Sequence, residues 1–134
     1  NARGLVVQEN KTTLSGGQNA ASLSLDENGA TFSDPENGKP IQVHGVADGT
    51  APFDAVNVRQ LYSGLAAVLA AGTPELRLEP GKTSAAVGVG YYGGYSGVGL
   101  GLGHMYDNGT VVSMSVGKAT DSEVAVKGSV SWTW

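Results

Sequence analysis

The chain has 134 residues and a formal net charge of −4, with no cysteine and two histidines. The lack of cysteine excludes disulfide scaffolds and thiolate chemistry, and the negative charge argues against nucleic acid as a partner. Charged residues make up 15% of the chain, against about 25% in a typical protein. Glycine accounts for 21 of the 134 residues, about twice its typical share of about 7%. This composition does not fit an ordinary soluble domain. The chain starts without Met or a signal peptide, so we expect an excised fragment or a processed product.

Residues 1–44 are polar, with short β-like runs at residues 5–7, 22–25, 30–33 and 41–43. Clusters of Gly, Asn, Asp and Pro separate these runs, and such clusters favour turns. The pattern predicts a β-rich connector. It holds too few large apolar residues for a core of its own. We therefore expect it to bury its apolar face against copies of itself or against a partner.

Residues 54–72 are predicted to form one helix, with Asp54 as N-cap and Gly72 just past its end. Four apolar residues in it are spaced 3, 4 and 3, as in the seam of a coiled coil. They are Val58, Leu61, Leu65 and Val68. The second half of the helix otherwise carries mainly Ala, Gly and Ser. A helix buried in an ordinary core has a similar pattern, so the seam alone does not decide between the two.

Residues 83–134 contain four alternating runs joined at residues 93–94, 107–109 and 119–122. Links this short predict hairpins, and hence an antiparallel meander of four strands. One face of the meander carries large apolar side chains: Val87, Val89, Val98, Leu100, Leu102, Val112, Met114, Val116, Val124, Val126 and Val130. The other face carries small ones: Gly88, Gly90, Gly97, Gly99, Gly101, Gly103, Ser113 and Ser115, with Gly117 also on it.

The small face indicates where this sheet lies. A face turned to water should carry Lys, Glu and Thr, whereas glycine in a strand usually marks the close approach of another backbone. Both faces are therefore expected to be covered, the apolar one by lipid. Aromatic residues near the strand ends fit the girdles of a membrane barrel. They are Tyr91, Tyr92, Tyr95, Tyr106, Trp132 and Trp134.

The size of a barrel limits the number of chains. At about 4.8 Å between strands and a tilt near 40°, four strands would close at about 8 Å, which is impossible. Twelve strands give roughly 24 Å, and three helices need about 21 Å, which fits if the facing side chains are small. A homotrimer is thus the smallest assembly that holds one helix per chain; a tetramer also fits, loosely.

The run at residues 45–50, Gly-Val-Ala-Asp-Gly-Thr, continues into Asp-Ala-Val-Asn-Val-Arg-Gln-Leu at residues 54–61. This run resembles the neck of trimeric autotransporter adhesins. The helix, the four strands and the terminal Trp134 resemble the YadA-type C-terminal anchor. The resemblance covers residues 41–134 and is weaker over residues 1–40.

The resemblance implies a Gram-negative outer-membrane barrel of 12 strands from three chains, with three helices in the lumen, preceded by a β-rich stalk connector. The seam then corresponds to the helix bundle, the small face to the lumen wall, and Trp134 to the signal read by the barrel assembly machinery. The N-terminal part is expected on the cell surface. The anchor would export its own passenger by type V secretion, and that missing passenger would bind host or other surfaces.

The domain organisation expected on this basis has five parts. Residues 1–44 form an extracellular connector, residues 45–53 the neck and residues 54–72 the coiled-coil and lumen helix. Residues 73–82 form a periplasmic linker, and residues 83–134 the barrel segment. We expect no enzymatic activity, no cofactor and no metal. Residues 88–93 match a dinucleotide-binding fingerprint by letters alone, but a strand and not a helix follows.

Two alternatives keep the same elements. A soluble trimeric stalk or fibre module, with no membrane role, would pack the apolar strand face in a protein core. An open pore for solutes would need an empty lumen, which the Ala-rich helix argues against. At the start of the helix, Arg59 is expected to be solvated or paired within the trimer at the pore mouth.

Overall fold

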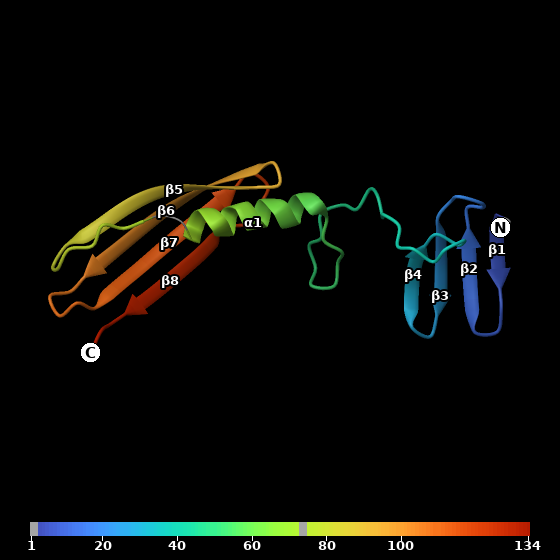
Figure 1. Cartoon of the computed structure of the whole chain (residues 1–134), viewed down its shortest axis with the longest axis horizontal. Coiled ribbons are helices and arrows are strands. Elements are labelled where there is room, and N and C mark those ends of the chain that lie inside the picture. The colour runs from blue at the N-terminus through green and yellow to red at the C-terminus, as the bar shows by residue number, and fades with distance from the viewer. Residues whose placement is uncertain (1–2, 73–74) are drawn as a thin grey trace. The chain divides into compact units, whose positions relative to one another are not determined.

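A computed structural model describes residues 3–72 and 75–134 of the chain. The chain forms two compact units, Asn1–Val46 and Ala47–Trp134. Figure 1 shows each unit as a sheet of its own, with a single helix in the second unit. The two units are described separately.

The first unit is an antiparallel meander of four short strands. They are β1 (Gly4–Val7), β2 (Lys11–Ser15), β3 (Ser22–Asp26) and β4 (Gly29–Ser33), hydrogen-bonded in that order. The region is β-rich as expected: β1, β3 and β4 coincide with three of the predicted runs, whereas β2 was not predicted. The sequence Lys-Thr-Thr-Leu-Ser forms β2 although Leu14 is its only apolar residue, because threonine fits a pleated strand well.

The run at residues 41–43 is not a strand, so that expectation was wrong. The residue before it, Pro40, pairs with Ser33 in an isolated antiparallel bridge. Proline has no N–H to donate to a ladder, so the pairing along β4 does not continue. The turn before the bridge is held by Asp34, which accepts the N–H of Glu36 at its carboxylate (2.9 Å) and the N–H of Gly38 at its carbonyl (2.8 Å).

Among its described residues, the second unit contains one helix, α1 (Val58–Gly72). It begins four residues later than expected, and Asp54 is not its cap. The cap is Asn57, whose Oδ1 accepts the N–H of Gln60 at 2.8 Å. Asp54 instead closes the preceding turn, since its Oδ2 accepts the N–H groups of Thr50 at 2.9 Å and Ala51 at 2.8 Å. Its carboxylate is thus already used and cannot cap the helix.

The sheet of the second unit has the predicted meander. Its strands are β5 (Thr83–Tyr92), β6 (Tyr95–Met105), β7 (Val111–Ala119) and β8 (Ala125–Ser131), hydrogen-bonded in that order. Gly93 and Gly94 form the two-residue link between β5 and β6, both with positive φ (57° and 91°), as a type I′ hairpin turn requires. The last strand ends at Ser131, so Trp132 and Trp134 lie beyond it.

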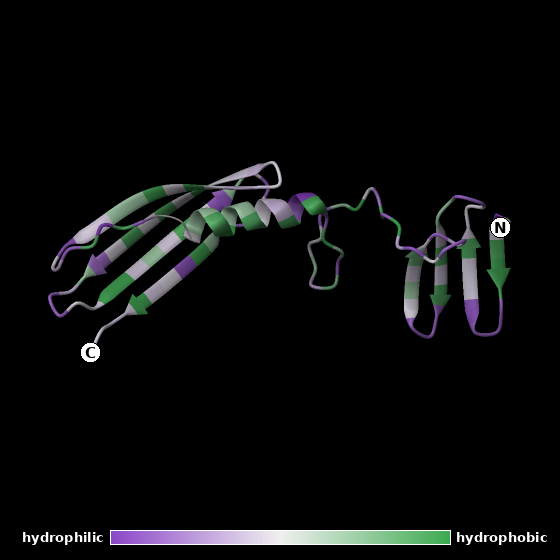
Figure 2. Ribbon diagram, viewed as in Figure 1, coloured by the Kyte–Doolittle hydropathy of each residue, from purple (hydrophilic) through white to green (hydrophobic). Residues whose placement is uncertain are grey.

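The sheet formed by β5–β8 curves around α1, which lies along its concave face (Figure 1). Large and small residues alternate along each strand, which gives the banded colouring in Figure 2. After the helix, residues 73 and 74 of the expected linker lie outside the described residues. The linker ends beside β6, where the N–H of Gly81 donates to the carbonyl of Met105 at 2.7 Å. Over the described residues, no helix has the length and hydropathy needed to span a membrane.

Candidate functional site: the helix–sheet interface and the neck

The side of α1 that faces the sheet consists of small residues. They are Ser63, Ala66, Ala67, Ala70 and Ala71, and each is at most 4% exposed. A helix with no side chain larger than Ser or Ala on one side lets a neighbouring backbone come closer than the usual helix-packing distance of about 8–10 Å. The interface inside one chain is therefore a close backbone approach and not an interdigitated core.

The sheet residues beneath α1 are glycines, which we call the glycine wall: Gly90, Gly97, Gly99 and Gly117. A Cβ atom on Gly90 would lie 2.6 Å from the nitrogen of Ala70, and one on Gly97 would lie 2.6 Å from the carbonyl oxygen of Ala66. Added Cβ atoms on Gly99 and Gly117 would overlap the carbonyl oxygens of Ala70 and Ala67. Since real Cβ atoms essentially never come within 3.0 Å of a neighbour, the helix occupies space that only glycine leaves open.

The remaining small-face residues have other neighbours. Ser115 donates a hydrogen bond to the carbonyl oxygen of Ala71, near the end of the helix, at 2.6 Å. Ser113 pairs with Ser129 of the neighbouring strand at 2.6 Å, and an added Cβ on Gly103 would meet the side chain of Leu76. Gly101 is buried and Gly88 is half-buried. All eight candidates thus lie on the face that carries the helix, as their alternation predicts.

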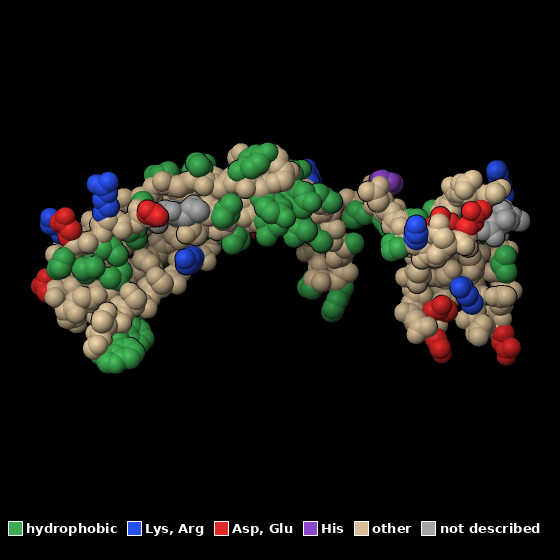
Figure 3. Space-filling view, viewed as in Figure 1, with side chains coloured by type: hydrophobic (Ala, Val, Ile, Leu, Met, Phe, Trp, Pro, Cys, Tyr) green, Lys and Arg blue, Asp and Glu red, His purple; other side chains and the backbone are tan. Residues whose placement is uncertain are grey.

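The opposite face of the sheet carries the large apolar residues and is open. Of the eleven residues assigned to it, all are exposed except the half-buried Val116. Their exposed fractions reach 75% at Val89. Figure 3, which views this unit from the side of the helix, shows further apolar side chains gathered over α1. The arrangement reverses the usual polarity of a sheet, because the small residues are covered and the large apolar ones are not.

The predicted seam lies on the free side of α1. Val58, Leu61, Leu65 and Val68 are 39–62% exposed within one chain. At 100° per residue, the centre of the seam lies about 180° around the helix from the centre of the buried Ala side. One side of α1 therefore packs on its own sheet, and the other side presents a row of large apolar residues that the described part of this unit leaves exposed.

Two tyrosine rings pack against each other at the end of the helix–sheet interface that lies beside the turn between β5 and β6. The rings of Tyr62 on α1 and Tyr92 on β5 pack edge to face, with their centres 5.0 Å apart. An added Cβ on Gly93 would overlap the Tyr62 ring. Glycine at position 93 is therefore favoured for two reasons: its φ is positive, and the Tyr62 ring occupies the space that a side chain would need.

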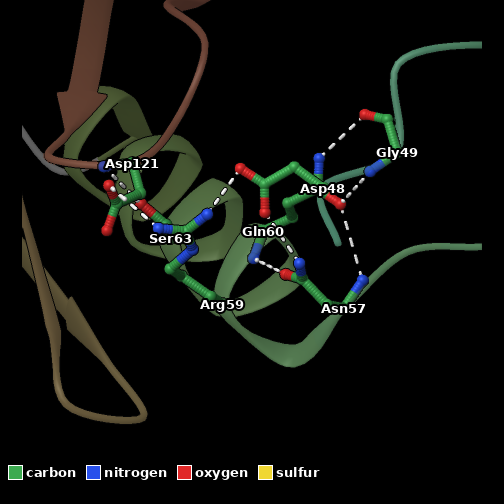
Figure 4. A network of polar contacts seen from close by, with 7 residues as sticks. All are labelled: Asp48, Gly49, Asn57, Arg59, Gln60, Ser63 and Asp121. Carbon is green, nitrogen blue, oxygen red and sulfur yellow. Dashed lines mark hydrogen bonds and ion pairs between the residues drawn. The ribbon is translucent and has the colours of Figure 1, made fainter. Parts of the chain in front are cut away.

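The neck, residues 45–53, connects to the first turn of the helix through a polar network, drawn in Figure 4. Arg59 pairs with Asp48 at 2.6 Å, and Asn57 donates to the other oxygen of Asp48 at 2.7 Å. Gln60 accepts the N–H of Gly49 at 2.9 Å and donates to the Gly49 carbonyl at 3.0 Å. The cap residue Asn57 and the helix residue Arg59 thus hold Asp48, and Gln60 holds Gly49.

The same region also connects to the turn between β7 and β8. The buried hydroxyl of Ser63 accepts the N–H of Asp121 at 3.1 Å, and the Arg59 guanidinium lies 3.9 Å from the Asp121 carboxylate. Arg59 therefore has partners in its own chain, on the neck and on the sheet. These residues give Arg59 a more specific role than the solvation or trimer pairing expected for it.

Hydrogen bonds set the ionisation of the two neck carboxylates. The pKa of Asp48 is lowered by its hydrogen bonds to Arg59 and then Asn57. The pKa of Asp54 is lowered by the N–H groups of Ala51 and Thr50, which stabilise the charged form. Both groups are therefore ionised at neutral pH, and the conformation of the neck depends on that charge.

The sequence analysis did not identify several of these residues as part of the site. The spacing Asn57-Val-Arg-Gln60 is that of a capping box, a signal that would have placed the start of the helix correctly. The alternation of β7 identifies Gly117, which was placed on the small face but not among the lumen-wall residues. The contact between Ser63 and Asp121 joins residues 58 positions apart, and no local pattern identifies it.

Comparison with protein families agrees with this geometry. Residues 75–134 match the model of the YadA-like membrane anchor domain, and residues 42–81 match that of the coiled stalk of trimeric autotransporter adhesin. The chain thus carries the membrane anchor and stalk base of a trimeric autotransporter adhesin. These families are structural and adhesive, form homotrimers and belong to the bacterial outer membrane. No curated protein matches the chain.

Proposed function

We propose that three copies of this chain build a barrel of 12 strands in the outer membrane, with three α1 helices in its lumen. The observation that carries the proposal is the pairing of the glycine wall with the Ala side of α1. It brings the helix against the small face of the sheet, while the seam and the large apolar face remain free. These two free surfaces suit two different environments, the other helices and lipid.

The sheet edges support the same assembly. The outer strands of the four-stranded sheet are β5 and β8, whose outward N–H and C=O groups need partners in a membrane. Closure through β5 and β8 of neighbouring copies removes every edge. With a strand spacing of about 4.8 Å, three sheets close into a barrel whose diameter holds three helices, provided that the helix residues facing the barrel wall are small.

In this barrel, the anchor exports and displays its own N-terminal passenger, which binds host or other surfaces. Export needs a wall that an extended chain can pass, and small residues leave that room before the helices fill the lumen. The helix runs from the cell surface towards the periplasm, so the turns at residues 93–94 and 119–122 lie on the extracellular side of the membrane. The terminal Trp134, which is fully exposed in one chain, is the part that the barrel assembly machinery reads.

The first test is the mass of the detergent-solubilised protein on a denaturing gel, unheated and boiled. We expect an unheated band near three times 13.6 kDa that collapses to the monomer on boiling. A monomer in both lanes, soluble without detergent, would contradict the barrel and favour a soluble stalk module.

Single cysteines then locate the lipid, because the chain has no cysteine of its own. Leu100→Cys in reconstituted vesicles should react with a lipid-soluble maleimide and resist a water-soluble one. Asn108→Cys, in the turn between β6 and β7, is the matched control and should react with the water-soluble reagent once the vesicles are opened. Equal reactivity of the two cysteines towards the water-soluble reagent would place Leu100 outside lipid.

A further inference from the structure

The face of the β5–β8 sheet that carries the large apolar residues, called the outer face below, has a polar end. At the end of β6 away from the turn at residues 93–94, strand pairing places Thr83, His104 and Val112 in one row on this face. Tyr106 follows His104, and the two rings pack edge to face with their centres 4.7 Å apart. A hydroxyl, an imidazole and a phenol therefore gather at this end.

A hollow of about 230 Å³ lies beside these polar groups. Its lining has an apolar part and a polar part. The side chains are Leu102, Val112 and Met114 in the first, and Thr83, His104 and Tyr106 in the second. The described residues that line the hollow include no Asp or Glu. An apolar hollow with a few convergent polar groups fits a ligand that has a hydrocarbon part and a polar head.

The polar part offers hydrogen-bond donors. His104 Nδ1 and Thr83 Oγ1 lie 2.9 Å apart and share one hydrogen bond. Either direction of this bond leaves a donor for a ligand: Nε2–H of His104 if Thr83 donates, or the Thr83 hydroxyl if the imidazole donates. The Tyr106 phenol is a further donor. The head of the ligand is therefore expected to be an acceptor, and phosphate oxygens are strong ones.

The imidazole is also held in position before any ligand binds. Thr83 fixes one of its ring nitrogens, and the Tyr106 ring packs against it. Two acids at the same end of the sheet have other neighbours, since Glu79 pairs with Lys82, and an added Cβ on Gly81 would lie 3.2 Å from Asp107 Oδ1. A site that is already ordered loses less entropy on binding.

We propose that this hollow binds one phospholipid in each chain, with the phosphate on His104, Thr83 and Tyr106 and an acyl chain against Leu102 and Met114. The inference rests on the proposed function, because the barrel places the outer face in lipid and this end of β6 on the periplasmic side. The ligand therefore comes from the periplasmic leaflet, whose lipids are phospholipids. Hydrogen bonds at the edge of the hydrocarbon region are stronger than in water, since the dielectric constant is lower.

Native mass spectrometry of the full-length trimer, exchanged into detergent and titrated with phosphatidylethanolamine, counts the bound lipid. We expect up to three lipids to be retained by each trimer. His104→Phe keeps a ring against Tyr106 but loses the hydrogen bonds of the imidazole, so it should bind the lipid about tenfold more weakly. Tyr91→Phe is the matched control. Tyr91 lies on the outer face at the other end of the sheet, so the loss of its hydroxyl should leave binding unchanged.

Diacylglycerol with the same acyl chains separates the head from the tail, because it lacks the phosphate. The unaltered trimer should bind it no better than the His104→Phe trimer binds phosphatidylethanolamine. Equal affinity of the two trimers for phosphatidylethanolamine would overturn the proposal, as would equal affinity of the unaltered trimer for the two lipids. A trimer on the unheated gel that retains no phospholipid would refute this inference alone, whereas a monomer soluble without detergent would refute the barrel with it.

Discussion

Gly99 lies against the backbone of Ala70 so closely that a Cβ atom on Gly99 would overlap the Ala70 carbonyl oxygen, well inside the 3.0 Å that real Cβ atoms keep. The atom in the way is backbone, which cannot turn aside as a flexible side chain would. The position of α1 on the sheet therefore depends on the absence of a single methyl group.

Gly99→Ala should push α1 away from the sheet and lower the stability of the trimer. Overpacking of this kind costs about 1–3 kcal/mol at each site, and the trimer contains the site three times. We expect the unheated trimer band to collapse at a clearly lower temperature. Gly128→Ala is the matched control, because its added Cβ would meet nothing closer than the Ser113 carbonyl oxygen at 3.8 Å. Equal collapse temperatures for the two variants would contradict the close approach.

Leu65→Ala tests whether the seam packs between copies. Leu65 is 39% exposed in one chain, and alanine favours a helix, so an isolated chain should tolerate the change. If three helices pack through the seam, the loss of the side chain costs about 2–5 kcal/mol at each copy. The measurement is the collapse temperature of the trimer, with Leu65→Met as the volume-conserving control. An unchanged temperature for Leu65→Ala would place the seam outside the interface.

Leu100→Arg tests the outer face of the sheet. A charge near the middle of a lipid-facing strand costs about 2–4 kcal/mol and should reduce insertion into membranes. The membrane-inserted fraction is measured after refolding into vesicles, next to Asn108→Arg, whose site lies in a turn and should be unaffected. In a soluble stalk module, Leu100→Arg would unfold the trimer whether or not lipid is present.

The neck should loosen in acid. The pKa values of Asp48 and Asp54 in the fold lie below the ordinary value of 3.8, so their stabilising effect is complete above 3.8 and is lost as the pH falls through the lower, folded values. Hydrogen exchange should show the protection of the Thr50 and Ala51 amides falling below pH 3.8, since both donate to Asp54.

Two controls accompany the pH measurement. The amide of Gly38 donates to the backbone carbonyl of Asp34 and to no carboxylate, so its protection should not follow the ionisation of Asp54. In Asp54→Asn, which cannot ionise, the amides of Thr50 and Ala51 should lose their pH dependence over the same range. A dependence that persists in this variant would assign the effect to another group.

The strands of the second unit could be predicted because period-2 alternation and glycine turns are local signals. The start of the helix could not be assigned correctly from Asp54 alone. Asp54 and Asn57 are both suitable caps by residue type, and the choice between them depends on Thr50 and Ala51, which engage the Asp54 carboxylate. The strand β2 was missed because its residues are polar. The partners of Arg59 were missed because Asp48 and Asp121 come from two segments that are far apart in the sequence.

The two sides of α1 also have a consequence for the kinetics of assembly. Contacts of Ala66 and Ala70 with the glycine wall form inside one chain, so their rate does not depend on how many chains are present. Contacts of Leu61 and Leu65 need other chains, so their rate rises with protein concentration. Refolding should therefore show a first-order phase, in which the helix docks, and a concentration-dependent phase, in which the trimer closes. Between these phases each chain exposes its seam and its outer strand face, and at that stage dilution or a holding chaperone would protect it from aggregation.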